Sequence, residues 1–117
     1  MHVPTISELA GAFGEVPQSV AEVGVGRYLA LDAWPAGEVL VGSSVAGRSL
    51  RVYINPAAER VRVQINSPDP VVDLELDHVR AVDVIADNAP YRGISVRIGE
   101  TQTFELRTYP EIDLRSS

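Results

Sequence analysis

The sequence predicts a mainly β fold, an antiparallel sandwich or small barrel of about eight short strands preceded by a short N-terminal helix. Three observations predict it. Apolar and polar residues alternate with a period of two through most of the chain after residue 27, which is typical of strands with one buried face. The strand-like segments recur about every ten residues and are separated by turn residues. Two pairs of them fit together as hairpins in a single register.

The chain has 117 residues, 45% of them apolar, which suits one domain spanning residues 1–117. We divide it into a helical N-terminal segment (1–26), a β domain (27–109) and a tail (110–117). No apolar run is long enough to cross a membrane, and the N-terminus lacks the features of a secretory signal. We therefore expect a cytoplasmic or virion protein that is not secreted and has no membrane partner.

Charge and composition narrow the classes of function further. The chain has no cysteine, which excludes disulfides, thiolate metal sites and cysteine nucleophiles. It also has no lysine, so its ten basic residues are all arginine, as in the proteins of high-GC bacteria and their phages. The net charge is −6. An acidic domain is repelled by phosphate backbones, so we expect no nucleic-acid partner.

The N-terminal helix is predicted over residues 5–13. Thr5 and Glu8 have the spacing of a capping box, in which each side chain accepts a hydrogen bond from the other residue's backbone N–H. Gly11 or Gly14 is expected to end the helix. The apolar residues that share one helical face are Ile6, Leu9, Ala10 and Phe13.

A second short helical turn is expected over residues 17–24, because Pro17 stands near its start and Gly24 follows its end. The β pattern begins after it. The expected strands are residues 27–34, 38–45, 48–55, 60–66, 71–76, 78–86, 91–98 and 102–109.

Residues 48–66 form the clearest predicted hairpin. If Asn55 pairs with Arg60 across the Pro-Ala-Ala-Glu loop, every apolar residue of one strand faces an apolar residue of the other. Tyr53 then lies opposite Arg62 on the other face, where the two side chains are expected to form a cation–π pair. The apolar residues of the two strands are Leu50, Val52, Ile54, Val61, Val63 and Ile65.

The last two expected strands form a second hairpin. Val96 pairs with Phe104, and Ile94 with Leu106, only if residues 99–101 make a three-residue turn.

Two charged strand faces are expected to meet. The outward basic and aromatic residues of the first hairpin are Arg51, Tyr53, Arg60 and Arg62, and the outward carboxylates of the following strand are Asp73, Glu75 and Asp77. We expect the arginines to face these carboxylates across the sheet, or the equivalent carboxylates of a partner. A cation held by two carboxylates, or a base stacked on Tyr53, is the alternative use of this face.

No motif in the chain predicts an enzyme. His78 directly follows Asp77, so the two side chains project from opposite faces of a strand and cannot form an Asp–His pair. Ser43 and Ser44 do not have the spacing of a nucleophile elbow. We expect no catalytic residue, no metal site and no cofactor. The alternative is a small enzyme whose active site consists of carboxylates that the fold brings together.

Four residues are candidates for partner contacts, because tryptophan, tyrosine and arginine are the residue types that dominate interface energetics. These residues are Trp34, Tyr91, Arg92 and Tyr109. The alternative is that Trp34 closes one end of the β structure and Tyr91 packs over a loop.

Our first hypothesis is a non-catalytic assembly protein that docks onto itself or a larger complex, such as a phage decoration or head–tail joining protein. Its expected partner is a protein, in a homo-oligomer or a larger assembly. The alternative is an acidic inhibitor, such as an immunity protein that masks the basic site of a toxin. A third hypothesis is a small-ligand-binding barrel or small enzyme.

Overall fold

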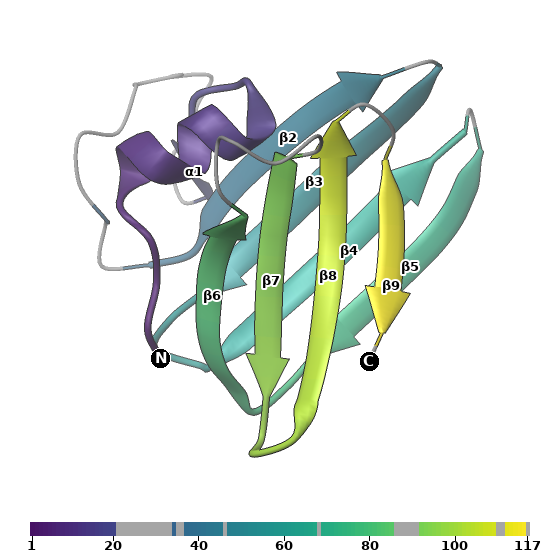
Figure 1. Ribbon diagram of the computed structural model, residues 1–117. Coiled ribbons are helices and arrows are strands. Elements are labelled where there is room, and N and C mark those ends of the chain that lie inside the picture. The colour runs from purple at the N-terminus through teal and green to yellow at the C-terminus, as the bar shows by residue number, and fades with distance from the viewer. Residues whose placement is uncertain are drawn as a thin grey trace.

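The computed structural model describes residues 1–20, 34, 37–45, 47–67, 69–85, 92–109 and 112–116. Within these residues the chain forms nine strands in two antiparallel sheets and one short N-terminal helix (Figure 1). The predicted mainly β class is confirmed, and the two separate sheets make the fold a sandwich.

Each sheet is a meander in which strands adjacent in sequence lie side by side. The first sheet contains, in order, β1 (Gln18–Ser19), β2 (Val39–Val45), β3 (Arg48–Asn55), β4 (Arg60–Asn66) and β5 (Pro70–Leu76). The second contains β6 (Val79–Ile85), β7 (Arg92–Ile98), β8 (Gln102–Tyr109) and β9 (Asp113–Ser116). Figure 1 shows the two sheets packed face to face, with their strands crossing obliquely.

Both predicted hairpins have the expected register. In β3 and β4, Asn55 pairs with Arg60 and Tyr53 lies opposite Arg62. In β7 and β8, Val96 pairs with Phe104 around the turn at residues 99–101. The registers are determined by burial, because a shift of one residue would turn every apolar side chain toward solvent.

The inward-facing side chains of both sheets form one hydrophobic core. In the first hairpin, Val52 and Ile54 of β3 and Val61 of β4 have no exposed surface. The largest buried core side chains from the other elements are Leu9, Ile94, Leu106 and Ile112.

Helix α1 (Ile6–Phe13) packs against β2 of the first sheet and β6, β7 and β8 of the second, so it covers one end of the sandwich (Figure 1). The predicted capping box is present, with both hydrogen bonds between Thr5 and Glu8 at 3.1 Å. Gly14 ends the helix with a φ of 75°, a left-handed conformation that glycine adopts without strain. The buried Thr108 hydroxyl of β8 donates to the carbonyl of Ala12, which anchors the end of the helix.

The chain passes from the first sheet to the second at a tight corner between β5 and β6. His78 occupies this corner with a φ of 58°, and its carbonyl accepts a hydrogen bond from the N–H of Gly99 at 3.2 Å. The Val79 N–H donates to the carbonyl of Glu59 at 2.9 Å. His78 is therefore an exposed corner residue before β6 rather than the first residue of that strand.

Three expected segments differ from the structure or lie outside it. Residues 18–19, expected within a helical turn at 17–24, form β1 because they pair with Val39 and Leu40 of β2. Part of the expected tail at 110–117 forms β9, which pairs with β8 and begins directly after the buried Ile112. The expected strand at 27–34 lies outside the described residues except for Trp34.

Candidate partner interface

Arg60 and Arg62 of the first hairpin contact the carboxylates Asp73, Glu75 and Asp77, as the sequence predicts. Arg62 binds Asp73 through two hydrogen bonds, Nε to Oδ1 at 3.1 Å and Nη2 to Oδ2 at 3.0 Å. The Nε of Arg60 lies 2.8 Å from Asp77 and 3.1 Å from Glu75. The five side chains form a charged ladder along the outer face of β4, β5 and the residue that follows β5, and about half of each side chain is exposed.

Hydrogen bonds in this charged ladder favour the ionised forms of Asp73, Arg60 and Arg62. The Arg62 guanidinium lowers the pKa of Asp73, chiefly through their side-chain hydrogen bond. The same bond raises the pKa of Arg62, and the hydrogen bond to Asp77 raises that of Arg60. Since all the members are exposed, the ladder contributes little to stability, and its charge remains available to a partner.

Arg51 does not join the charged ladder, although we expected it to face these carboxylates. Its neighbours across the sheet are Gly42 on β2 and Gln64 on β4, and Gln64 separates it from Asp73 on β5. Because β4 lies between them, the backbones of Arg51 and Asp73 are two strand spacings apart, about 9.5 Å. Within the part of the chain that the structure describes, no ion pair is found for this exposed guanidinium.

The cation–π contact lies elsewhere than predicted. Tyr53 and Arg62 are cross-strand neighbours, but the Arg62 guanidinium is held by Asp73. Among the described residues the cation–π contact joins Arg92 of β7 to the ring of Tyr109 on β8, with 4.7 Å between the guanidinium carbon and the ring centroid.

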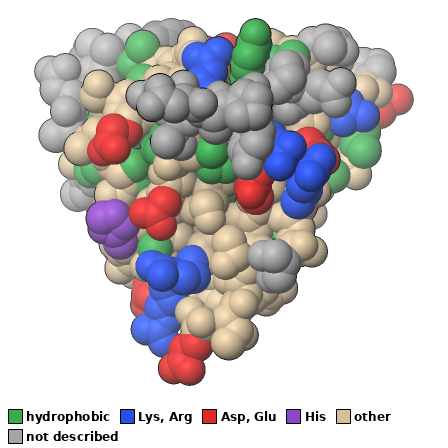
Figure 2. All heavy atoms as spheres, viewed as in Figure 1, with side chains coloured by type: hydrophobic (Ala, Val, Ile, Leu, Met, Phe, Trp, Pro, Cys, Tyr) green, Lys and Arg blue, Asp and Glu red, His purple; other side chains and the backbone are tan. Residues whose placement is uncertain are grey.

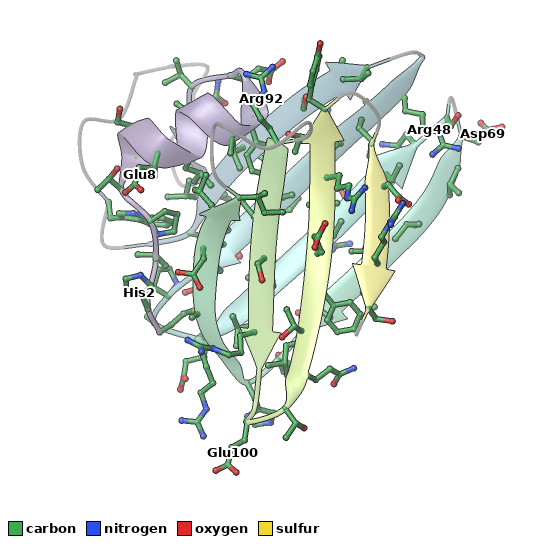
Figure 3. The ribbon with its side chains drawn as sticks, viewed as in Figure 1. His2, Glu8, Arg48, Asp69, Arg92 and Glu100 are labelled. Carbon is green, nitrogen blue, oxygen red and sulfur yellow. The ribbon has the colours of Figure 1, made fainter. Side chains whose placement is uncertain are left out.

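The fold therefore brings together Arg92 and Tyr109, two of the four residues that the sequence suggests for partner contacts. They pair at the end of the second sheet near α1, where Arg92 is labelled in Figure 3. Tyr109 is 50% exposed, which leaves an aromatic surface for a partner. Trp34 packs against the core and donates from Nε1 to the carbonyl of Pro4 at 2.6 Å, in line with the alternative that it closes the β structure. Tyr91 lies outside the described residues.

A shallow groove of about 520 Å³ lies on the outer face of β2 and β3. The segment that follows α1 forms one wall, with Glu15 and the 52%-exposed Val16. Leu40, Arg51 and Tyr53 line the sheet side. The sequence does not predict this groove, because it depends on how residues 14–20 cross the sheet.

The described residues on the outer face of the second sheet carry charges of both signs (Figure 2). Neighbouring charges neutralise one another there, as in the pair Arg107–Glu105 at 2.8 Å and the pair Arg115–Asp113 at 2.7 Å. On the described strands of this sheet the arginines outnumber the carboxylates, so this face has no negative excess like that found along β5.

The described residues contain no group of three or more histidine or carboxylate side chains positioned to hold a metal ion. No helix in the same residues is long and apolar enough to cross a membrane.

Comparison with known proteins places the fold. No protein-family model matches the chain, and no curated protein sequence is significantly similar to it. A solved structure does match over nearly the whole length. It is a chain of a contact-dependent growth inhibition toxin–immunity protein complex from Klebsiella pneumoniae 342, with a TM-score of 0.76 and 16% identity. The match covers 99% of this chain and 95% of that chain.

The likeness bears on the hypotheses drawn from the sequence. At 16% identity it shows a shared fold and a shared chain length. It gives no support to our first hypothesis, the phage assembly protein.

Proposed function

We propose that this chain is an immunity-type inhibitor that binds a protein toxin and masks a basic site on it. The main support is the full-length likeness to a chain of a toxin–immunity protein complex. The net charge of −6 adds an independent reason, because an acidic inhibitor is attracted to a basic site before contact.

The charged ladder of β4 and β5 suits this role in its chemistry. Three carboxylates share two arginines, so the ladder keeps one negative charge in excess. Exposed charges of this kind steer a partner and select its orientation more than they add affinity. The exposed Arg92–Tyr109 pair supplies the residue types that contribute binding energy at an interface.

The direct test is neutralisation of a toxin. The candidate toxin is the product of the gene beside the one that encodes this chain, induced in a bacterial host with and without the chain. We expect the chain to restore growth and to co-elute with the toxin as a stable complex. The Val52→Asp variant is the control, because it buries an unpaired charge in the core and should neither fold nor protect. Unrestored growth and no complex, despite soluble expression of both proteins, would refute the proposal.

Light scattering separates this proposal from the assembly hypothesis. An inhibitor of this kind is expected to elute as a monodisperse monomer of 12.6 kDa. A higher-order assembly at micromolar concentration would instead support a structural subunit.

A further inference from the structure

The free edge of β5 differs from the other edges of the sandwich. From it we propose that a protein partner docks by adding an extended, basic segment to the first sheet as a further strand beside Pro70–Leu76. The inference rests on the proposed function in that it names the surface that binds the partner. Strand addition of this kind obtains affinity from backbone hydrogen bonds and specificity from alternate side chains.

Among the described residues, the other three edges end in a short strand or are partly covered by a neighbouring segment. β1 has two residues and β9 has four. At β6, the N-terminal segment pairs in parallel with the strand: the His2 N–H donates to Arg80 at 3.0 Å, and the Val82 N–H donates to His2 at 2.8 Å. Short edges and covered edges are two common ways in which proteins prevent unwanted strand pairing.

The β5 edge is both long and open. The strand has seven residues, and among the described residues only β4 pairs with it. In an antiparallel sheet every second residue of an edge strand directs its backbone N–H and C=O away from the sheet. As far as the described residues go, β5 therefore presents an unpaired hydrogen-bonding ladder about 20 Å long.

Each face of β5 favours a particular partner strand. On the outer face, Val71 is 62% exposed and precedes Asp73 and Glu75. On the inner face, Val72 and Leu74 are only half-buried, because no strand covers them on the open side. An added strand with alternating basic and apolar residues would pair its basic side chains with the carboxylates and complete the burial of the apolar ones.

A second copy of β5 is a poor occupant of the same edge. When two identical strands pair antiparallel about a two-fold axis, residues of the same face lie opposite one another. In the register that overlaps the whole of β5, Asp73 would lie directly opposite Asp73 of the second copy, and like charges directly opposite are destabilising. The occupant is therefore a basic segment of a different protein.

The chain itself supplies a probe for the test. A peptide with the β4 sequence Arg-Val-Arg-Val-Gln-Ile-Asn already matches the register and the charges of β5 on its other side. Added at up to millimolar concentration to the folded, isotope-labelled protein, it should shift the amide resonances of residues 71–76 and slow their hydrogen exchange. The matched control peptide, with both arginines replaced by glutamate, should leave these amides unchanged.

Two charge variants test the side-chain part of the proposal. Asp73→Asn with Glu75→Gln should weaken binding of the arginine peptide by about three- to tenfold, as expected for two exposed ion pairs. Asp83→Asn with Glu100→Gln makes the same change in net charge away from β5 and should leave the affinity within about twofold.

Several results would overturn the inference. Equal binding of both peptides would do so, and so would protection from hydrogen exchange outside residues 71–76 or no protection at millimolar peptide. Protection of β5 that increases with protein concentration in the absence of peptide would show that a second copy occupies the edge. The experiment requires no toxin, so it fails or succeeds independently of the proposed function. Toxin neutralisation without peptide binding would leave the inhibitor role intact and remove β5 as its docking edge.

Discussion

At Gly93 the backbone of β7 approaches β8 too closely for any side chain. A Cβ atom at this position would stand 2.9 Å from the Cα of Arg107 and even closer to the carbonyl oxygen of Leu106. The register of β7 and β8 shifts between Arg92 and Gly93, so the glycine lies at a bulge beside the Arg92–Tyr109 contact. Glycine is required here because backbone, rather than a flexible side chain, occupies the space.

Replacing Gly93 with alanine should therefore destabilise the fold by about 3 kcal/mol or more, or prevent folding, because neither strand can move without losing its ladder. Gly11→Ala is the matched control. Gly11 is exposed in α1 and an added methyl group would meet open space, so alanine should raise stability there by about 0.5–1 kcal/mol. Urea denaturation measures both values. A Gly93→Ala protein of normal stability would mean that β7 and β8 can separate at the bulge.

At the scale of the elements, the charged ladder makes the folded state depend on pH in acid. The pKa of Asp73 is lower in the folded protein than in the unfolded chain because Arg62 donates hydrogen bonds to the carboxylate. A carboxyl group with a lowered pKa contributes stability above its unfolded pKa, and this contribution is lost as pH falls through the folded pKa. For an aspartate the loss begins near pH 4 and continues below it.

The Asp73→Asn variant should consequently show a weaker dependence of stability on pH below about pH 4 than the parent protein. Arg62→Ser should weaken the dependence similarly, because it removes the partner that lowers the pKa of Asp73. Urea midpoints measured from pH 5 to pH 2 test both variants. If the two variants retain the parent's full slope, acid destabilisation originates in other carboxylates, such as Asp113 beside Arg115.

Long alternating segments could be predicted from the sequence, and very short ones could not. The register of β3 and β4 follows from three apolar pairs that fit in one alignment. β1 is too short to show a period, and only its pairing with β2 makes it a strand. β9 has a weak signal, because Ile112 and Leu114 alternate with Asp113 and Arg115, but four residues after a proline resemble a tail as much as a strand.

The candidate site could also be predicted only in part. Alternation placed Arg60 and Arg62 on the face of the carboxylates, and adjacency in the chain suggested that β4 and β5 pair. The position of Arg51 depends on counting strands, since β3 does not neighbour β5. The open β5 edge could not be predicted at all, because it is defined by the strand order of both sheets and by the N-terminal segment that covers β6.

At the scale of the whole molecule, charge is distributed unevenly over the two sheets. On the described strands of the second sheet, arginines outnumber carboxylates, and two same-strand pairs form, Arg107–Glu105 and Arg115–Asp113. On the first sheet, Asp73 and Glu75 of the last strand and Asp77 just after it lie together, with one charge in excess over the two arginines that bind them. A basic partner therefore encounters an oriented field, in which the β5 side of the molecule attracts it first.

This asymmetry predicts how the chain associates with the proposed toxin. Asp73→Asn with Glu75→Gln should slow association severalfold at low salt and flatten its salt dependence, because exposed charges at an interface act mainly on the rate of encounter. At about 0.5 M salt, where screening shortens the reach of exposed charges to a few ångströms, the variant and the parent should associate at similar rates. Asp83→Asn with Glu100→Gln removes the same net charge from the second sheet, so it separates a local effect from a global one. Stopped-flow mixing measures all three rates. Equal slowing by both double variants would show that the net charge of −6 attracts the partner without a preferred face. Unchanged association rates in both variants would mean that electrostatic attraction has no part in the encounter.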